Sequence, residues 1–407
     1  MSDILIARQP IYDRDLQVVG YEVLYRSKRE DIADIIDGDS ATLRVLANTF
    51  LEIGLEDLLG NRPAFINCSR NFLIDENPLH LPVGKAVLEV TENIAPDPEV
   101  LQGIRNLASR GYQIALDDFC LEPQNRPLLE VTNYVKFDVI GAHRARILED
   151  AKELRQLGIK LIAEKVESQE DFDLCKEIGF DLFQGYFLCK PRVIRREHAP
   201  ANELAVMKLM AELQNPDADA RDIERIIATD VTLSYRLLRY VNSAFFGLRK
   251  KIDSIQRAIV LLGFRNIRTW ATVIALSGIE GKPGELLHIS LMRARFCELI
   301  AAQTDKKLQD AAFTVGLFSV LDALLDLPMR EALDPLPLAP AVESALIDQS
   351  GPLGQILQCV QAYQRGHWAG VDNFPSLSAA LGQAYLSALA WSDQAAAALS
   401  APASETA

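Results

Sequence analysis

The sequence predicts two domains of different classes, a (β/α)₈ TIM-like barrel followed by an all-helical bundle. Eight short apolar runs alternate with helical stretches in the first half of the chain, and alternation repeated this often is typical of a closed, mostly parallel barrel. From residue 201 the β-branched runs stop, and apolar residues such as Leu204, Met207 and Leu213 recur at helical spacing. At 407 residues the chain also exceeds one ordinary domain. We therefore expect a barrel over 1–198, a helical domain over 199–395 and a flexible tail over 396–407.

The first domain is predicted from the order of its elements. Runs of this length without helical periodicity are typical of buried strands. The eight predicted strands are ILIARQPI (4–11), VVGYEVLYR (18–26), AFINCS (64–69), AVLEVTE (86–92), QIALDDF (113–119), YVKFDVI (134–140), KLIAEKVE (160–167) and LFQGYFL (182–188). The predicted helices are 40–55, 97–111, 142–158 and 168–179, with Gly54, Gly111, Gly158 and Gly179 at or near their ends.

Composition excludes several classes of protein. The net charge of −14 opposes nonspecific binding to nucleic acid or to an anionic membrane. Six cysteines without a CxxC pair are typical of reduced thiols in a cytoplasmic protein. The N-terminus lacks the features of a signal peptide, and no apolar run is long enough to span a bilayer. We expect no direct nucleic-acid contact and no membrane association.

Polar residues in or at the ends of successive predicted strands indicate one active site at the mouth of the barrel. Six carboxylates meeting there could not all ionise without a compensating cation. Oxygen ligands without histidine or cysteine favour Mg²⁺ or Mn²⁺ over zinc. The candidates are Glu22, Asn67, Glu89, Asp117, Asp118, Lys136, Glu164, Glu167 and Gln184.

The chemistry that these residues favour is hydrolysis of a phosphodiester. The adjacent Asp117 and Asp118 would serve two metal ions about 4 Å apart, which suits in-line attack by water. Lys136 would orient the water and Glu164 would take its proton. Any one of the acids could instead be a solvated loop residue, but their serial order at strand ends argues against this for the whole set.

Seven motifs of the first domain resemble, in order, those of EAL domains, the cyclic di-GMP phosphodiesterases. They are YEVLYR (21–26), FINCS (65–69), LEVTE (88–92), LDDF (116–119), VKFD (135–138), AEKVE (163–167) and QGY (184–186). The resemblance implies a modified (β/α)₈ barrel with one antiparallel strand. It also implies cyclic di-GMP as substrate or ligand, Mg²⁺ or Mn²⁺ as cofactor and pGpG as the product of hydrolysis.

The resemblance also implies a role for each candidate residue. Glu22, Asn67, Glu89 and Asp117 would hold one metal ion, and Asp117 with Asp118 the second. Lys136 and Glu164 would act on the water, while Glu167 and Gln184 would complete the shell of metal and water. Arg26 would contact a phosphate of the nucleotide, and Glu92 would brace a loop.

Three departures from the family pattern weaken the expectation of an active enzyme. The signature tripeptide reads Glu22-Val23-Leu24, a change that should pack without touching the carboxylate. The loop after Asp118 reads CLEPQNRP in place of glycines and serines, with Cys120, Glu122 and Pro123 stiffening it and changing its charge. Lys165 stands where the family has glycine; we expect its side chain to point outward, although it could instead neutralise part of the acidic mouth.

The second half, over residues 209–268, resembles the HDOD domain, a relative of the HD phosphohydrolases. Its matching pieces include Asn215-Pro216, the segment 241–244 and Leu261-Leu262-Gly263. An HD hydrolase needs a His-Asp dipeptide, and the chain has none; at the corresponding place it has Phe318 and Ser319. We therefore expect no metal there and infer a module that binds an unidentified signalling protein.

The helical half has two further features that bear on its function. Its basic residues would form a patch, although a solvated face is the simpler interpretation; they are Arg249, Lys250, Lys251, Arg257, Arg265 and Arg268. The tryptophans Trp270, Trp368 and Trp391 lie among apolar residues, and we expect them to pack in a core or interface rather than stack on bases.

Two functions remain open for the whole chain, which resembles bacterial EAL–HDOD signalling proteins. In the first, which we favour from the sequence, the barrel binds cyclic di-GMP and metal with weak or lost hydrolysis. In the second it is an active phosphodiesterase. The resemblance leaves a homodimer open.

Overall fold

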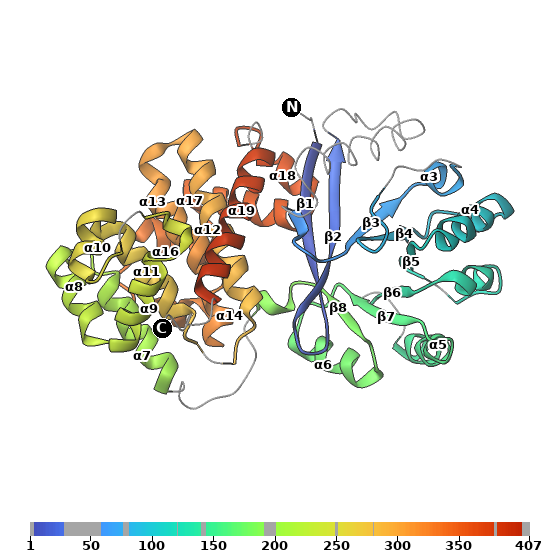
Figure 1. Ribbon diagram of the computed structural model, residues 1–407, viewed down its shortest axis with the longest axis horizontal. Helices are drawn as coiled ribbons and strands as arrows, with labels where there is room; N and C mark the ends of the chain where they lie inside the picture. The colour runs from blue at the N-terminus through green and yellow to red at the C-terminus, as the bar shows by residue number, and fades with distance from the viewer. Residues whose placement is uncertain are drawn as a thin grey trace. The chain divides into compact units, whose positions relative to one another are not determined.

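The computed structural model describes residues 4–27, 58–75, 81–119, 121–139, 144–190, 201–248, 251–279, 281–377 and 381–400. The chain divides into two compact units (Figure 1). The first comprises Met1–Leu188 together with Ala362–Trp368, and the second comprises Cys189–Gln361 and Ala369–Ala407. Within the described ranges, no helix has both the length and the apolar character that a membrane span needs.

The first unit is built on a closed barrel of eight strands in chain order, as the sequence predicts. β1 is antiparallel to both of its neighbours, β2 and β8, and every other neighbouring pair is parallel. This confirms the single antiparallel strand that the family resemblance implies. The strands are β1 (Ile4–Tyr12), β2 (Val18–Ser27), β3 (Ala64–Cys68), β4 (Ala86–Val90), β5 (Gln113–Leu116), β6 (Tyr134–Asp138), β7 (Lys160–Glu164) and β8 (Leu182–Gln184).

The later predicted strands run past their observed ends. The predicted run 113–119, for example, contains the strand 113–116, and the run 182–188 contains 182–184 followed by a 3₁₀ turn. The surplus residues belong to the turns that leave the sheet at the carboxyl ends of the strands. Polar side chains at these ends therefore lie at the mouth of the barrel.

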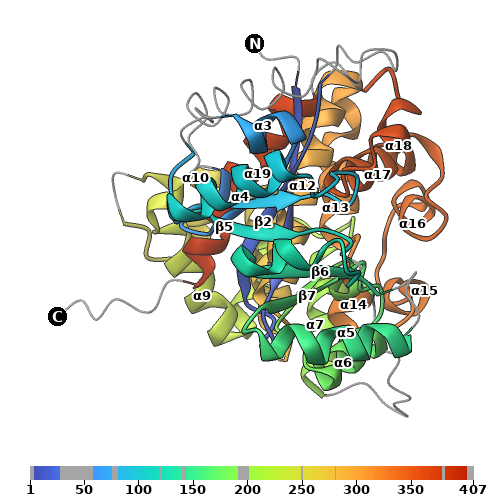
Figure 2. The ribbon, with the colours of Figure 1, turned by 90° about the vertical axis from the view of Figure 1, so that its right-hand side faces the viewer.

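Helices follow most of the strands and lie outside them (Figure 2). Helix α6 begins at a capping box of Ser168 and Asp171 and ends at Gly179, whose φ of 105° few other residues tolerate. Three of the four predicted helices are confirmed, whereas the stretch 40–55 with Gly54 lies outside the described residues. The helical elements are α3 (Arg70–Ile74), α4 (Pro98–Ser109), the 3₁₀ helix η1 (Arg126–Val131), α5 (Arg144–Gln156), α6 (Gln169–Ile178) and η2 (Phe187–Cys189).

The first unit also includes a segment from far along the chain, Ala362–Trp368. The buried hydroxyl of Tyr363 donates a 3.0 Å hydrogen bond to the carbonyl of Ile6 on β1. Tyr186 donates in the same way, at 3.0 Å, to the carbonyl of Gln364. A Cβ at Gly366 would come within 2.7 Å of Leu24, so the absence of a side chain allows this close approach.

The second unit is entirely helical over its described residues, as predicted. The long helix α12 packs against α13 and α19. The last helix continues to Ser400, beyond the end that we expected at residue 395, and residues 401–407 lie outside the described range. The helices are α7 (Ala201–Leu213), α8 (Ala220–Thr229), α9 (Val231–Val241), η3 (Ala244–Phe246), α10 (Ile255–Leu262), α11 (Phe264–Leu276), α12 (Gly284–Thr304), η4 (Lys306–Leu308), α13 (Gln309–Phe318), α14 (Leu321–Leu325), α15 (Met329–Leu333), α16 (Pro340–Ile347), α17 (Gly351–Gln364), α18 (Trp368–Asp372) and α19 (Leu381–Ser400).

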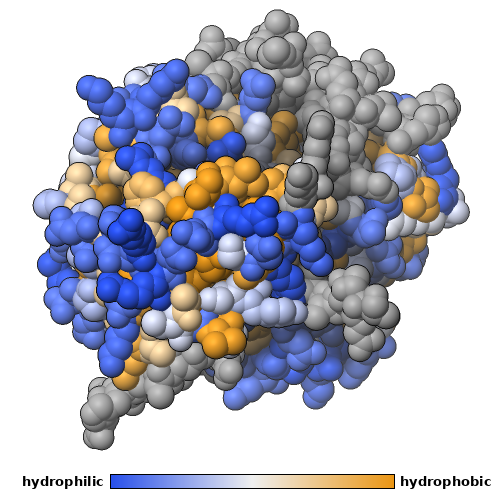
Figure 3. Space-filling view, turned by 60° about the vertical axis from the view of Figure 1, so that its left-hand side comes forward, coloured by the Kyte–Doolittle hydropathy of each residue, from blue (hydrophilic) through white to orange (hydrophobic). Residues whose placement is uncertain are grey.

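Aromatic side chains form much of the packing in the second unit. Trp270 is only 6% exposed, and its ring centroid lies 4.4 Å from that of Tyr240 and 5.5 Å from that of Trp391. Trp270 and Trp391 therefore pack against each other, as the sequence predicts. On the surface, hydrophobic residues gather in patches between hydrophilic ones (Figure 3).

Candidate active site at the mouth of the barrel

Four carboxylates from different strands surround the side chain of Lys136, which projects from β6. The Nζ atom of Lys136 lies 2.7 Å from Glu164 Oε1, 2.8 Å from Glu89 Oε1, 3.3 Å from Glu22 Oε2 and 3.6 Å from Asp117 Oδ1. We call these five residues the Lys136 cluster. The carboxylates come from β2, β4, the end of β5 and the end of β7, so closure of the barrel brings together residues far apart in sequence.

Two side-chain amides extend the cluster. Asn67 on β3 donates a 3.2 Å hydrogen bond to Glu22 Oε1. Gln184 at the end of β8 donates to Glu22 Oε2 and, at 3.1 Å, to Gln9 Oε1. The sequence interpretation missed Gln9, which lies opposite Glu22 in the register of β1 and β2. The antiparallel pairing that places it there leaves no sign in the local sequence pattern.

Burial sets the protonation of the Lys136 cluster. Burial alone lowers the pKa of Lys136, but the surrounding carboxylates outweigh it and hold the pKa well above its usual value. Burial raises the pKa of Glu89 well above its usual value, and Lys136 offsets only part of this effect. Burial likewise raises the pKa of Glu164 to about 8, with Asp117 and Glu22 adding to the rise. One ammonium does not offset four carboxylates, so the cluster favours uptake of protons or of a further cation.

Several buried oxygen atoms in this region lack hydrogen-bond donors. Asn67 Oδ1, Glu89 Oε2 and Gln184 Oε1 have none, and Glu89 Oε1 meets Lys136 at ion-pair distance without hydrogen-bond geometry. Buried acceptors without donors are costly. Hard oxygen atoms of carboxylates and amides are the ligands that Mg²⁺ and Mn²⁺ prefer. The donor set therefore fits a divalent cation.

The carboxylates do not, however, form a ready-made metal cage in this structure. Among the described residues, no three acidic, histidine or cysteine side chains are arranged around one point where a metal ion could be held. The ammonium of Lys136 is the cation on which the carboxylates converge. The sequence interpretation expected metal ions in this role and gave Lys136 only a part in handling water.

The other candidates lie at or near the surface of the first unit. Asp118, Glu167 and Glu92 are exposed, and Glu92 accepts a 3.4 Å hydrogen bond from Asn93. Asp118 also has a φ of 44°, an unusual backbone conformation for a residue other than glycine. Arg26 is half-buried on β2, where alternation places it on the same face of the strand as Glu22.

The departures from the family pattern have structural correlates. Leu24 packs against Gly366, as the approach of their atoms indicates. Lys165 has a φ of 55°, which explains why glycine is suited to this position. Its side chain points outward as expected: it is 56% exposed and forms an ion pair with Asp138. Cys120 lies outside the described residues, while Glu122 accepts a hydrogen bond from Gln124.

In the second unit, an arginine lies beside the position that an HD hydrolase would use for its metal ligands. Phe318 is fully buried, and Ser319 accepts a 3.2 Å hydrogen bond from Arg293. Arg293 is itself only 2% exposed. A buried guanidinium would oppose binding of a metal cation at this point.

Three of the four described basic residues of the expected patch, Lys251, Arg257 and Arg265, are exposed, and Arg268 is half-buried. Arg249 and Lys250 lie outside the described residues. Arg257 pairs with Asp253 and Arg265 pairs with Asp310, and all four side chains are largely exposed. These two arginines follow the simpler interpretation of a solvated face.

Comparison with known proteins finds relatives along nearly the whole chain. The EAL domain model matches residues 70–191, and the HDOD domain model matches residues 200–329. A cyclic di-GMP phosphodiesterase of Vibrio cholerae, CdgJ, is 35% identical over 377 residues, which cover 91% of this chain and 87% of the relative. The protein YuxH of Bacillus subtilis is 33% identical over 402 residues, covering 95% and 98%. Among solved structures, a manganese and cyclic di-GMP complex of Klebsiella pneumoniae BlrP1 is 24% identical, with a TM-score of 0.38, and the match covers 46% of this chain and 55% of that chain.

Proposed function

This chain belongs to the EAL–HDOD family, and from that premise we propose that its barrel is a divalent-cation-dependent cyclic di-GMP phosphodiesterase. The observation that carries the proposal is the convergence of Glu22, Glu89, Asp117 and Glu164 on Lys136. Further support comes from the relative in Vibrio cholerae, which is a cyclic di-GMP phosphodiesterase and aligns with 91% of this chain. The complete set of converging residues shifts the balance from the binding-only function that the sequence favoured.

The reaction is the opening of one phosphodiester bond of the cyclic dinucleotide by water. Water forms a new P–O bond, the P–O3′ bond breaks and the leaving 3′ oxygen takes a proton. The product is the linear dinucleotide pGpG with a 5′-phosphate. Glu164 accepts the proton of the attacking water from its position at the end of β7.

The chain's own residues divide the remaining tasks. Lys136 donates hydrogen bonds that orient the water, and Gln184 positions the water or substrate from the end of β8. Arg26 contacts a phosphate of the nucleotide, and Glu92 supports the loop after β4.

Three of the cation ligands, Glu22, Glu89 and Asp117, are residues that face Lys136. Glu22, Asn67, Glu89 and Asp117 would hold one Mg²⁺ or Mn²⁺, and Asp117, Asp118 and Glu167 would hold a second. When bound, such ions activate water and stabilise the leaving oxygen. Because Lys136 occupies the centre of the oxygen set, divalent ions compete with its ammonium for the same atoms.

The second candidate function is binding of cyclic di-GMP without hydrolysis. The observation that favours it is the position of Asp118, which is exposed and followed by the altered loop. An Asp118 that does not reach the second cation would leave a barrel that binds the nucleotide and signals through the helical unit.

One assay separates these two functions. The purified chain is incubated with cyclic di-GMP and Mn²⁺ or Mg²⁺, and chromatography measures pGpG. We expect turnover that Glu22→Gln and Glu164→Gln abolish and that Glu130→Gln, a change at an exposed carboxylate outside the cluster, leaves intact. Binding without turnover would establish the sensor, and absence of binding would refute both functions.

We further propose that the helical unit docks an unidentified signalling protein. Support comes from large apolar side chains exposed on α9 and α10, including Val231 at 80% and Val260 at 83%. The cytoplasmic location and the homodimer left open by the family resemblance stay predictions. Analytical ultracentrifugation of the purified chain tests the homodimer.

A further inference from the structure

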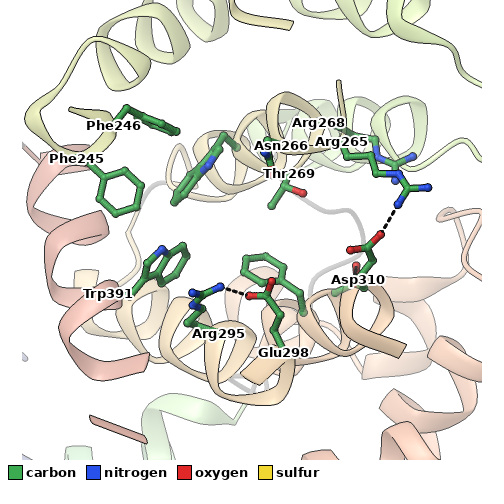
Figure 4. Close-up of a pocket in the computed structure, with 13 residues that line it drawn as sticks. Phe245, Phe246, Arg265, Asn266, Arg268, Thr269, Arg295, Glu298, Asp310 and Trp391 are labelled. Atoms are coloured by element: carbon green, nitrogen blue, oxygen red, sulfur yellow. Dashed lines mark hydrogen bonds and ion pairs between the residues drawn. The ribbon is translucent and has the colours of Figure 1, made fainter. Parts of the chain in front are cut away.

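A pocket of about 290 Å³ lies in the helical unit, between α11, α12, α13 and α19. Aromatic side chains occupy one end, where Phe245, Phe246 and Trp391 face the cavity (Figure 4). Arg265 and Arg268 lie at the other end. Small-molecule sites commonly combine a largely apolar wall with a few polar groups in this way.

An ion pair next to the aromatic end offers both a donor and an acceptor to a ligand. Arg295 Nη1 lies 2.7 Å from Glu298 Oε2, and the Arg295 guanidinium lies over the Trp391 ring at 5.7 Å from its centroid. The Nε atom of Arg295 is buried without a hydrogen-bond acceptor. Arg295 also lines the pocket, so the other N–H groups of its guanidinium can donate to an acceptor on the edge of a flat ring.

The arginine end of the pocket carries unbalanced positive charge. Arg265 pairs with Asp310 at 2.7 Å, whereas no carboxylate within the described part of the chain pairs with Arg268. Arg268 is half-buried, and burial and the nearby Arg265 lower the pKa of its guanidinium, which Asp310 offsets only in part. A neighbouring hollow of about 340 Å³ shares these two arginines, which leaves room for a ligand's charged end. Three arginines against two carboxylates make the pocket attractive to anions in a protein whose net charge is −14.

We propose that this pocket binds a guanine nucleotide, with the base at the aromatic end and the phosphate at Arg268. A guanine edge presents N–H donors to a carboxylate such as Glu298, and it presents O6 and N7 to an arginine such as Arg295. Aromatic side chains stack on bases, and guanidinium groups bind phosphate strongly. The assignment goes beyond the expectation that Trp391 serves only for packing. It does not rest on the phosphodiesterase activity, because the pocket lies wholly in the second unit.

The test measures binding of GMP to the full-length protein by calorimetry and tryptophan fluorescence. Chelator is present throughout, so that cation-dependent binding in the barrel does not contribute. We expect saturable binding of GMP and at least about tenfold weaker binding of AMP, because adenine lacks O6 for Arg295 and lacks the adjacent N1–H and N2–H donors that guanine presents to Glu298. Glu298→Gln should reduce this preference for guanine, because it removes the negative acceptor.

Variants at the two ends test the position of the ligand. Arg268→Ala and Trp391→Leu should each weaken GMP binding about tenfold or more, as expected for loss of a charge-assisted hydrogen bond or of base stacking. Arg268→Lys, which keeps the charge, should retain much of the affinity. The matched control Arg257→Ala removes an exposed arginine of the same unit outside the pocket and should leave the affinity unchanged.

Several outcomes would overturn the proposal. These are no binding of GMP at millimolar concentration, equal binding of AMP, or affinity that survives Arg268→Ala and Trp391→Leu. Thermal unfolding shows whether each variant is folded, and Arg268→Lys provides a folded comparison if Arg268→Ala is not. Glu22→Gln in the barrel should retain GMP binding, so failure of the phosphodiesterase proposal and failure of this one give different results.

Discussion

The carboxylate of Glu164 and the ammonium of Lys136 lie 2.7 Å apart in an ion pair at the mouth of the barrel. The residue proposed to take a proton from water is therefore held by a residue proposed to orient that water. The same ammonium also meets Glu89 at 2.8 Å. Lys136 thus acts as an internal cation that the proposed divalent ions would have to displace in part.

Replacing Lys136 with methionine tests this role. The change leaves Glu22, Glu89 and Glu164 buried without their cation, so the free energy of unfolding should fall by about 3–5 kcal/mol at pH 8. The loss should be smaller at pH 5, where protonated carboxylates no longer repel one another. Mn²⁺ should raise the Tm of Lys136→Met by more than it raises that of the wild type. Thermal unfolding followed by circular dichroism measures all three effects.

The control for this experiment is Lys160→Met, which removes an exposed lysine at the start of β7. Its Tm should differ little from that of the wild type at either pH. An equal loss of stability in Lys136→Met at pH 5 and pH 8, or a smaller response to Mn²⁺ than in the wild type, would contradict the internal-cation role.

The pKa of Glu164 predicts a dependence of stability on pH. Burial raises this pKa from its ordinary value of 4.5 to about 8, so the folded protein keeps a proton that the unfolded chain has lost. The contribution to stability is complete below about pH 4.5 and is lost as pH rises through 8. Glu164→Gln cannot ionise, so it should gain about 3–4 kcal/mol relative to the wild type between pH 5 and pH 8. Urea unfolding in chelator measures this difference, and a difference that is constant with pH would refute the raised pKa.

Much of the barrel could be predicted because parallel strands buried on both faces leave continuous apolar runs in the sequence. All eight strands fall within or close to such runs. The direction of β1 leaves no such mark, and only the family resemblance implied it. The contribution of 362–368 to the first unit could not be foreseen either, because contacts between distant segments have no local pattern.

Gly185, in the QGY motif after β8, should be intolerant of any side chain. A Cβ there would lie 2.0 Å from the carbonyl oxygen of Val166, and the φ of 155° adds strain. Gly185→Ala should therefore lower the free energy of unfolding by about 2–4 kcal/mol. Gly158→Ala is the matched control: it also has a positive φ, of 78°, but nothing lies within 4 Å. It should cost only about 1 kcal/mol, and equal losses in the two variants, measured by denaturant midpoints, would argue against the close contact.

Lys165→Gly restores the family residue at a position with a φ of 55°. Glycine relieves about 1–2 kcal/mol of backbone strain, whereas the exposed ion pair with Asp138 contributes about 1 kcal/mol or less. The variant should therefore be as stable as the wild type or slightly more stable. Calorimetric titration should find the affinity for Mn²⁺ unchanged, because the lysine points outward. Tighter Mn²⁺ binding would mean that Lys165 neutralises the acidic mouth after all.

Part of the candidate site could be predicted from polar residues in the apolar runs of the sequence. Glu22, Asn67, Glu89 and Gln184 can be found because each is a polar residue in or at the end of an apolar run, and the barrel brings neighbouring strands together. The central position of Lys136 could not be predicted, since its reach across the barrel depends on how the opposite strands close. Gln9 escaped notice for a related reason: its partner is set by the register of β1 with β2.

The hydrogen bond from Tyr363 to Ile6 has a consequence for the order of events during synthesis. The strands of the barrel leave the ribosome early, whereas the segment 362–368 follows only after most of the helical unit has been made. During translation the barrel therefore lacks the hydrogen bond from Tyr363 to the carbonyl of Ile6 until most of the chain has been made. The first unit to be made is among the last to be finished.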